Sequence, residues 1–260
     1  MPAHDRNLRS VRGRDPDSAS GVSPARVAAT VPGEIVVRAT IGDTLDALAA
    51  DLMAQALTCA ARFGNFHLAV GGDQSIEAVY LRLMSDPVLR AMPWSRTHLW
   101  LTHDQLGAEG PIVFPAVREC LVDHAGIPVE QIHAIDLAET EPVEVYESTL
   151  RASLRSRPRG GDRLDAAVVT LDAAGRIGGL DSSCSAAPGA ASIPERWCLP
   201  LAGGGVSLSG SFLRASRLLA VCVLGVERGR ALSAWADTDP GPIAGETRWY
   251  LDADAAGVCG

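Results

Sequence analysis

Apolar residues follow a helical spacing in some stretches of this chain and form short unbroken runs in others. Between residues 44 and 64, leucine, methionine and alanine recur every three or four positions, which predicts an amphipathic helix. Residues 66–70 form a short, mostly apolar run that is typical of a buried strand. A glycine-containing turn at 71–75 leads from this strand into a second helical pattern at 76–84.

The same order repeats along the next part of the chain. Strands are predicted at 97–101, 132–136 and 165–171, and helices at 111–125 and 142–155. After a loop at 172–194, candidate strands at 206–208, 218–224 and 247–251 surround a helix at 226–236, and a short helix is expected at 252–258. This alternation predicts an α/β fold: a mainly parallel, Rossmann-like sheet flanked by helices, with a more strand-rich C-terminal portion.

The first part of the chain lacks this patterning. Residues 1–33 are rich in arginine, aspartate, serine, alanine, glycine and proline, and apolar residues first cluster at 35–37. We therefore expect a disordered leader over 1–33 and one α/β domain over 34–260.

Charge and composition exclude several classes of function. A net charge of −8 disfavours a broad surface for nucleic acid or anionic membrane, and no long apolar run predicts a membrane span or a signal core. We therefore expect a cytoplasmic protein. All 23 basic residues are arginine, which excludes a Schiff-base lysine and a P-loop lysine. The six cysteines are scattered without a CxxC pair, so no metal and no cofactor are predicted.

Ligands of open parallel sheets bind beyond the carboxyl ends of the strands. Three loops should lie there, at residues 71–75, 103–107 and 172–179.

The third of these loops carries a family resemblance. The segment 164–181, LDAAVVTLDAAGRIGGLD, resembles the strand and G-x-G-x-D-G-H loop of the 6-phosphogluconolactonase family, which belongs with the glucosamine-6-phosphate deaminases in a wider superfamily. Asp165 and Gly175 match the family pattern, but Arg176 stands at the position of its catalytic histidine. Arginine stays protonated and cannot act as the base in lactone hydrolysis, although it can bind a phosphate or carboxylate. Alternatively, Arg176 pairs with Asp172 or Asp181 and only holds the loop.

The first loop matches the family's G-G-S-T-P phosphate loop only in Gly71 and Gly72. The resemblance implies phosphate binding by Gly71, Gly72 and Ser75, but Asp73 would repel a phosphate at close range. A plain glycine turn with Asp73 or Ser75 capping the next helix is an equal alternative.

The second loop has His103, Asp104 and Gln105 where the family has D-E-R. His103 is a candidate substitute base with Asp104 as its orienting acid, against the alternative of an ordinary polar loop.

Two C-terminal segments extend the resemblance. The family's R-I-T-L-T matches residues 205–209, where Gly205 replaces the arginine, and its G-x-x-K-A matches residues 225–229, where Arg228 keeps the charge. Arg176 and Arg228 are therefore candidate anion-binding residues.

Taken together, the resemblance implies a divergent 6-phosphogluconolactonase-like protein of the sugar-phosphate (pentose phosphate) type. Its lactonase activity is expected to be weak or absent, and its partner a small anionic ligand such as a sugar phosphate, or another protein. The alternative is an active lactonase or related sugar-phosphate hydrolase with a site rebuilt around His103. A nucleotide-dependent enzyme using the Gly71–Gly72 turn is a third reading, but the chain has no G-x-G-x-x-G run.

Overall fold

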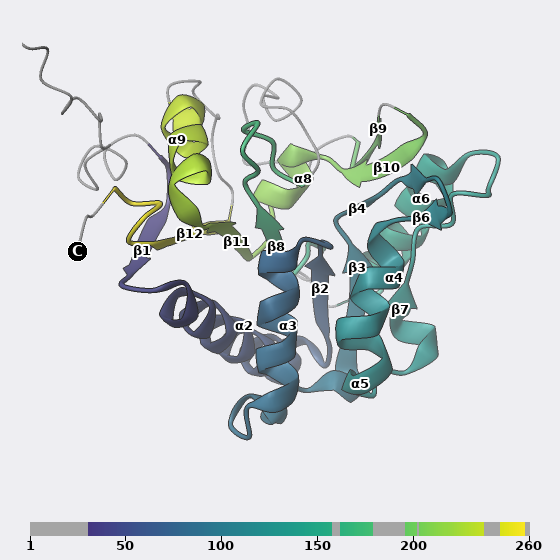
Figure 1. Cartoon of the computed structure of the whole chain (residues 1–260). Coiled ribbons are helices and arrows are strands. Elements are labelled where there is room, and N and C mark those ends of the chain that lie inside the picture. Colours follow the sequence, from purple (N-terminus) through teal and green to yellow (C-terminus); the bar gives the residue numbers. More distant parts are fainter. Residues whose placement is uncertain (1–30, 158–161, 179–195, 202, 237–244, 258–260) are drawn as a thin grey trace, which may run out of the picture.

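A parallel sheet of seven strands forms the centre of the molecule (Figure 1). The computed structural model describes residues 31–157, 162–178, 196–201, 203–236 and 245–257. The strand order is β1-β12-β11-β8-β2-β3-β7, and every neighbouring pair is parallel. The strands are β1 (Glu34–Arg38), β2 (Phe66–Val70), β3 (Thr97–Leu101), β7 (Ile132–His133), β8 (Ala166–Thr170), β11 (Leu218–Val223) and β12 (Glu246–Asp252). The predicted α/β fold with a mainly parallel sheet is confirmed.

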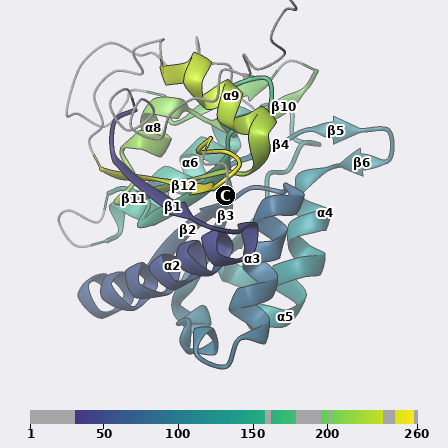
Figure 2. The same ribbon diagram turned by 60° about the vertical axis from the view of Figure 1, so that its left-hand side comes forward.

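Helices cover both faces of this sheet (Figure 2). One face carries α2 (Ile41–Phe63), α3 (Gln74–Ser85), α4 (Val113–Val117), a π-helical turn (Arg118–Val122) and α5 (Asp123–Ala125). The other face carries α6 (Pro142–Arg155) and α9 (Gly225–Ala236). The short helix α8 (Gly210–Arg214) precedes β11, and 3₁₀ turns lie at Leu89–Ala91, Trp94–Arg96 and Val129–Gln131.

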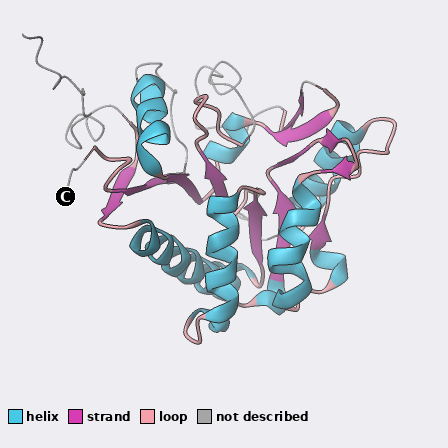
Figure 3. Cartoon of the chain, viewed as in Figure 1, coloured by secondary structure: helices cyan, strands magenta, loops and turns pink. Residues whose placement is uncertain are grey.

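Smaller β elements stand beyond one end of the central sheet (Figure 3). Strands β4 (His103–Asp104), β10 (Gly205–Leu208) and β9 (Cys198–Leu201) form an antiparallel sheet, and β5 (Leu106–Gly107) pairs with β6 (Gly110–Pro111). The strand predicted at 206–208 therefore exists, but it lies outside the central sheet. Because residue 111 belongs to this hairpin, the helix predicted from residue 111 begins at Val113.

The C-terminal helix predicted at 252–258 is wrong within the described residues. Asp252 ends β12, and residues 253–257 form turns. Asp252 accepts hydrogen bonds from the backbone N–H groups of Gly225 and Ala255, which ties these turns to the start of α9.

Local capping sets the ends of α2. The Thr40 hydroxyl oxygen accepts a hydrogen bond from the Asp43 N–H at 3.1 Å, so the helix begins at Ile41 rather than at the predicted residue 44. Gly64 ends the helix with φ at 88°, a left-handed conformation that glycine adopts without steric cost.

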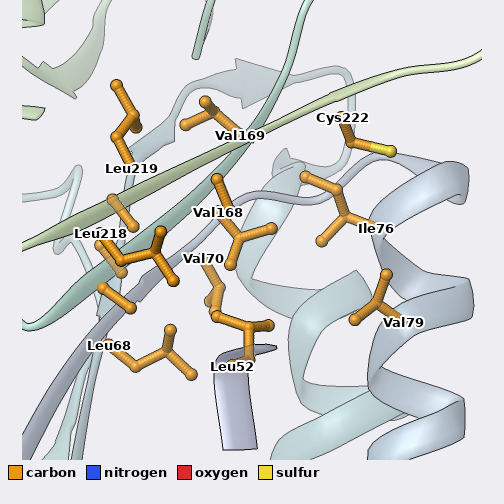
Figure 4. Packing of buried hydrophobic residues seen from close by; sticks show 14 of the residues in the cluster. Leu52, Leu68, Val70, Ile76, Val79, Val168, Val169, Leu218, Leu219 and Cys222 are labelled. Carbon is orange, nitrogen blue, oxygen red and sulfur yellow. The ribbon is translucent and has the colours of Figure 1, made fainter. Parts of the chain in front are cut away.

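The core lies between the sheet and these helices. Every residue of β2 is buried. Figure 4 shows Ile76 and Val79 of α3 on one side of the cluster that also contains Val70 and Val168 of the sheet and Leu52 of α2. Each fully buried aliphatic side chain contributes about 1.5–3 kcal/mol relative to an exposed one. The core therefore holds the carboxyl ends of β2, β3 and β8 in place.

A row of stacked rings crosses the face of the sheet that α6 covers. His67 of β2 stacks on His98 of β3 with ring centroids 4.5 Å apart, and Trp100 stacks on His133 of β7 at 3.7 Å. The Trp100 indole N–H donates to Nδ1 of His67 at 3.1 Å, and Trp100 meets Tyr146 of α6 edge-on. Burial, together with the charges of neighbouring histidines, lowers the pKa of His67 to about 2 and that of His133 to about 4. The rings of His67 and His133 are therefore neutral in the native protein at neutral pH.

An ion pair lies at the opposite end of β8 from the carboxyl-end loops. The Asp165 carboxylate accepts hydrogen bonds from Arg157 at 2.8 Å, Arg217 at 3.2 Å and the His67 backbone N–H at 2.8 Å. The side chains of Arg157 and Asp165 are 1% and 0% exposed. This pair is thus structural and ties the start of β8 to β2.

Val31, the first of the described residues, is buried. The Trp249 indole N–H donates to the Pro32 carbonyl at 2.9 Å, so the last residues assigned to the leader contact the domain. The rest of the predicted leader lies outside the described residues. Among the described helices, none has the length and apolar character needed to cross a bilayer.

Candidate functional site

A polar pocket of about 200 Å³ opens beyond the carboxyl ends of β2, β3 and β8. The pocket therefore lies where a ligand site of an open parallel sheet is expected. Its lining comes from the three predicted loops and the strand ends beside them: Gly71, Gly72, Asp73, Ile76, Thr102, His103, Gln105, Val169, Thr170, Asp172, Arg176 and Gly178.

Gly71 and Gly72 let the loop after β2 pass close to its neighbours. A Cβ atom on Gly72 would lie 3.0 Å from Cγ1 of Val113 and 3.3 Å from its Cα, at the start of α4. A Cβ atom on Gly71 would lie 3.3 Å from the Thr102 hydroxyl oxygen. The two glycines therefore have a packing role, whether or not their backbone also contacts a ligand.

Asp73 caps α3, as the alternative reading of this loop expected. Its Oδ1 accepts a hydrogen bond from the Ser75 N–H at 2.9 Å. The guanidinium of Arg228, on α9, donates to the same carboxylate, with Nη2 3.0 Å from Oδ2 and Nη1 3.4 Å from Oδ1. Nη1 also donates to the Ser75 hydroxyl at 3.1 Å. Ser75 and Arg228, both predicted to bind a ligand phosphate, thus bind Asp73 of this chain instead.

His103 reaches the pocket as predicted. Its Nδ1 shares a hydrogen bond of 3.1 Å with the hydroxyl of Thr102. Burial lowers the pKa of His103, and the nearby charge of Asp104 opposes this only in part. The imidazole is therefore neutral at pH 7, which is the form that can accept a proton.

Asp104 does not serve His103 in the way the sequence suggested. Its carboxylate is fully buried and accepts hydrogen bonds from four backbone N–H groups at 2.8–3.1 Å, those of Gln105, Ile112, Val113 and Phe114. Among the described residues it makes no hydrogen bond to His103. The two side chains alternate along β4 and so face opposite sides. Asp104 instead joins the β5–β6 hairpin to the start of α4.

Arg176 lies at the rim of the pocket in a closed turn. Its Nε donates to Oδ2 of Asp172 at 2.8 Å, and its backbone N–H donates to Oδ1 at 2.9 Å. Although burial alone would raise the pKa of Asp172, these hydrogen bonds hold it below its ordinary value. The Arg176 side chain is 49% exposed. The alternative in which Arg176 pairs with Asp172 is therefore what the structure contains, and Asp181 lies outside the described residues.

Gly205 leaves no room for the arginine of the matching family segment. A Cβ atom there would lie 2.5 Å from the Asp104 carbonyl oxygen and 2.8 Å from Cβ of Gln105. Two residues further on, the Ser207 hydroxyl lies within hydrogen-bonding distance of the carbonyls of Thr102 and Gly178. Strand β10 thus holds two loops of the pocket together.

Thr102 and Thr170 line the pocket but were not named as site residues from the sequence, whereas Gln105, which also lines it, lies in the second predicted loop. The two threonines could have been predicted as site residues, because Thr102 and Thr170 lie at the carboxyl ends of predicted strands, where side chains of parallel sheets face the ligand site.

Comparison with known proteins assigns this chain to a family. Residues 40–247 match the family described as glucosamine-6-phosphate isomerases/6-phosphogluconolactonase. The chain belongs to this family.

Two curated proteins are similar to this chain over part of their own length. The human GDH/6PGL endoplasmic bifunctional protein is 25% identical over 247 residues, covering 85% of this chain and 30% of that protein. The protein of the same name from Oryctolagus cuniculus is 25% identical over 240 residues, covering 82% of this chain and 28% of its own length. The chain therefore spans less than a third of these relatives.

Solved structures share the fold. The 6-phosphogluconolactonase from Thermotoga maritima superposes with a TM-score of 0.67 at 17% identity, covering 84% of this chain and 99% of the other. The Trypanosoma brucei 6-phosphogluconolactonase gives 0.64 at 16% identity, with 86% and 97% covered. Identities this low establish the architecture alone.

Proposed function

We propose that this chain is a divergent family member with weak or no 6-phosphogluconolactonase activity, which keeps its pocket as a binding site for a small polyhydroxylated ligand. The observation that carries the proposal is Arg176. It stands at the position that resembles the family's catalytic histidine, and Asp172 holds its side chain and its backbone.

The chemistry explains why this substitution matters. Lactone hydrolysis needs a group that removes a proton from the attacking water and returns one to the leaving oxygen, and such a group contributes roughly 10²- to 10⁴-fold in rate. A guanidinium group stays protonated and offers only donors. An ion pair with Asp172 further favours the charged form.

The test is hydrolysis of 6-phosphogluconolactone by the purified protein, measured against spontaneous hydrolysis in the same buffer. We expect no rate above the spontaneous one. Arg176→His and Arg176→Gln form a matched pair, because both remove the guanidinium and only the first supplies a titratable base. A gain in the histidine variant alone would assign the missing activity to this position. Turnover by the parent protein well above the spontaneous rate would overturn the proposal.

A second candidate is an active lactonase or related sugar-phosphate hydrolase that uses His103 as its base. Its support is that His103 lines the same pocket, is neutral, and has Nδ1 engaged with Thr102, which leaves Nε2 for a water or substrate. It predicts that the parent hydrolyses a lactone and that His103→Ala loses this activity while its thermal stability is unchanged. Equal turnover by His103→Ala and the parent would exclude the role.

The remaining expectations belong with this proposal. Relatives named for 6-phosphogluconolactone and glucosamine-6-phosphate support a ligand of the sugar class. A cytoplasmic location and a protein partner stay predictions from the sequence, and the human relative is named an endoplasmic protein.

A further inference from the structure

The beginning of α3 has the components of an anion site, and this chain fills them with its own carboxylate. The helix is 12 residues long, and its N-terminal N–H groups point toward the pocket loop. Arg228 adds a guanidinium fork, which suits a carboxylate or a phosphate equally. The Asp73 carboxylate binds both the helix start and the guanidinium. Its Oδ1 accepts from the Ser75 N–H at 2.9 Å, and its Oδ2 accepts from Nη2 of Arg228 at 3.0 Å.

Three backbone donors at the start of this helix are already used. The Ser75 N–H donates to the Asp73 carboxylate, and the N–H groups of Ile76 and Glu77 donate to the Asp73 carbonyl at 2.8 and 2.9 Å. The charge of Arg228 is balanced by the carboxylate it holds. The Arg228 and Asp73 side chains are only 22% and 30% exposed, so water screens this pair weakly.

Asp73 is also part of the pocket wall, whereas Ser75 and Arg228 do not line the pocket. A ligand entering from the pocket therefore meets the carboxylate before it can reach the arginine. A phosphate dianion at this point would face the negative charge of Asp73, and the guanidinium groups of Arg176 and Arg228 are each already paired with an aspartate of this chain.

We propose that Asp73 determines the specificity of the pocket: it occupies the anion position, so the pocket takes a small polyhydroxylated compound without a phosphate group, such as an aldonic acid or its lactone. This inference rests on the proposed function in taking the pocket as a ligand site. The remaining wall suits such a ligand, because Thr102, Thr170 and Gln105 offer hydroxyl and amide groups for hydrogen bonds. The volume of about 200 Å³ is below that of most drug-sized sites and fits a single small molecule.

Gluconate and 6-phosphogluconate differ only by a phosphate group and are the probes for this proposal. Isothermal titration calorimetry should show that the parent protein binds gluconate more tightly than 6-phosphogluconate. Asp73→Ser keeps a side chain that can cap α3 and removes the carboxylate. In this variant the affinity for 6-phosphogluconate should rise at least about tenfold, because the carboxylate that repels the phosphate is gone and Arg228 becomes available.

Two further variants separate this effect from a general change in charge or folding. Asp86→Ser removes one carboxylate at the other end of α3, where Asp86 is the C-cap, and should keep the parent's preference. The double variant Asp73→Ser/Arg228→Gln should lose the gain in 6-phosphogluconate binding. Thermal melting of each variant checks that the domain is folded before titration.

The proposal is overturned if the parent binds 6-phosphogluconate more tightly than gluconate, if it binds neither compound, or if folded Asp73→Ser leaves the preference unchanged. Binding is measured without turnover, so the result is separate from the hydrolysis assay. A parent protein that prefers 6-phosphogluconate yet hydrolyses no lactone would refute this inference and leave the proposed function standing.

Discussion

Acid should destabilise this protein through the buried ring of His67, in a pH range where carboxylates are still ionised. The pKa of His67 is lowered to about 2 in the native protein by burial and by the charges of His98, Arg157 and His133. In the unfolded chain the ring titrates near its ordinary value of about 6.5. Below that value the unfolded state binds a proton that the native state does not, so stability is full above about pH 6.5 and falls as the pH decreases toward about 2.

The magnitude follows from the two pKa values. At about pH 5, protonation favours the unfolded state by roughly 1.5 pH units, or about 2 kcal/mol, while the native ring stays neutral. A domain whose total stability is about 5–15 kcal/mol would lose a considerable part of it through one side chain.

The assay is urea unfolding of the parent and of His67→Asn between about pH 7.5 and about pH 5. Asparagine keeps an acceptor near the position where Nδ1 of His67 accepts from Trp100. The parent should lose about 2 kcal/mol more than the variant over this range. His98, His103 and His133, whose pKa values are also lowered, contribute to both proteins and largely cancel in the difference. The control is His124→Asn, at an exposed position of α5, which should keep the pH dependence of the parent. Equal pH dependence in the parent and His67→Asn would refute the reasoning.

Three further predictions concern stability, measured by urea unfolding. Asp165→Asn should cost about 3–5 kcal/mol, because it removes the buried negative charge that the guanidinium of Arg157 faces, and a loss below about 1 kcal/mol would contradict this. Asp104→Asn should cost about 1–3 kcal/mol, since its NH₂ group would face at least one backbone N–H donor, that of Phe114, and unchanged stability would contradict a structural role of the carboxylate. Gly205→Ala should cost about 1–3 kcal/mol because its Cβ would lie 2.5 Å from the Asp104 carbonyl oxygen, and a neutral result would mean that β4 moves freely.

Regular elements could be predicted from the sequence wherever their signal is local. The runs at 66–70 and 97–101 correspond to β2 and β3 at both ends, and the pattern at 142–155 corresponds to α6. Apolar periodicity and caps act over a few neighbouring residues, so they can be read without knowing the fold. The short strands β4, β5 and β6 were missed because two residues carry no period, and they form only when a distant partner is present.

The position of the pocket could also be predicted, because the end of each parallel strand is recognisable and such ends share one edge of the sheet. The roles of its residues could not. Asp104 was expected beside His103, but alternation along β4 turns its carboxylate toward the start of α4. Arg228 was expected to hold a ligand, but it holds Asp73.

The sequence by itself predicted most strands of the central sheet and most of its helices, the end of the sheet where a ligand site is expected, and an arginine, Arg176, at the position that resembles the family's histidine. The tertiary structure decided which charged side chains contact one another. Asp73 and Arg228 are 155 residues apart, and their contact depends on the strand order that places α3 and α9 at the same edge of the sheet. Ionic contacts act over a few ångströms, so their partners are set by packing and not by proximity along the chain. For that reason, Arg176 could be singled out from the residues alone, whereas the contact between Asp73 and Arg228 could be identified only in the folded molecule.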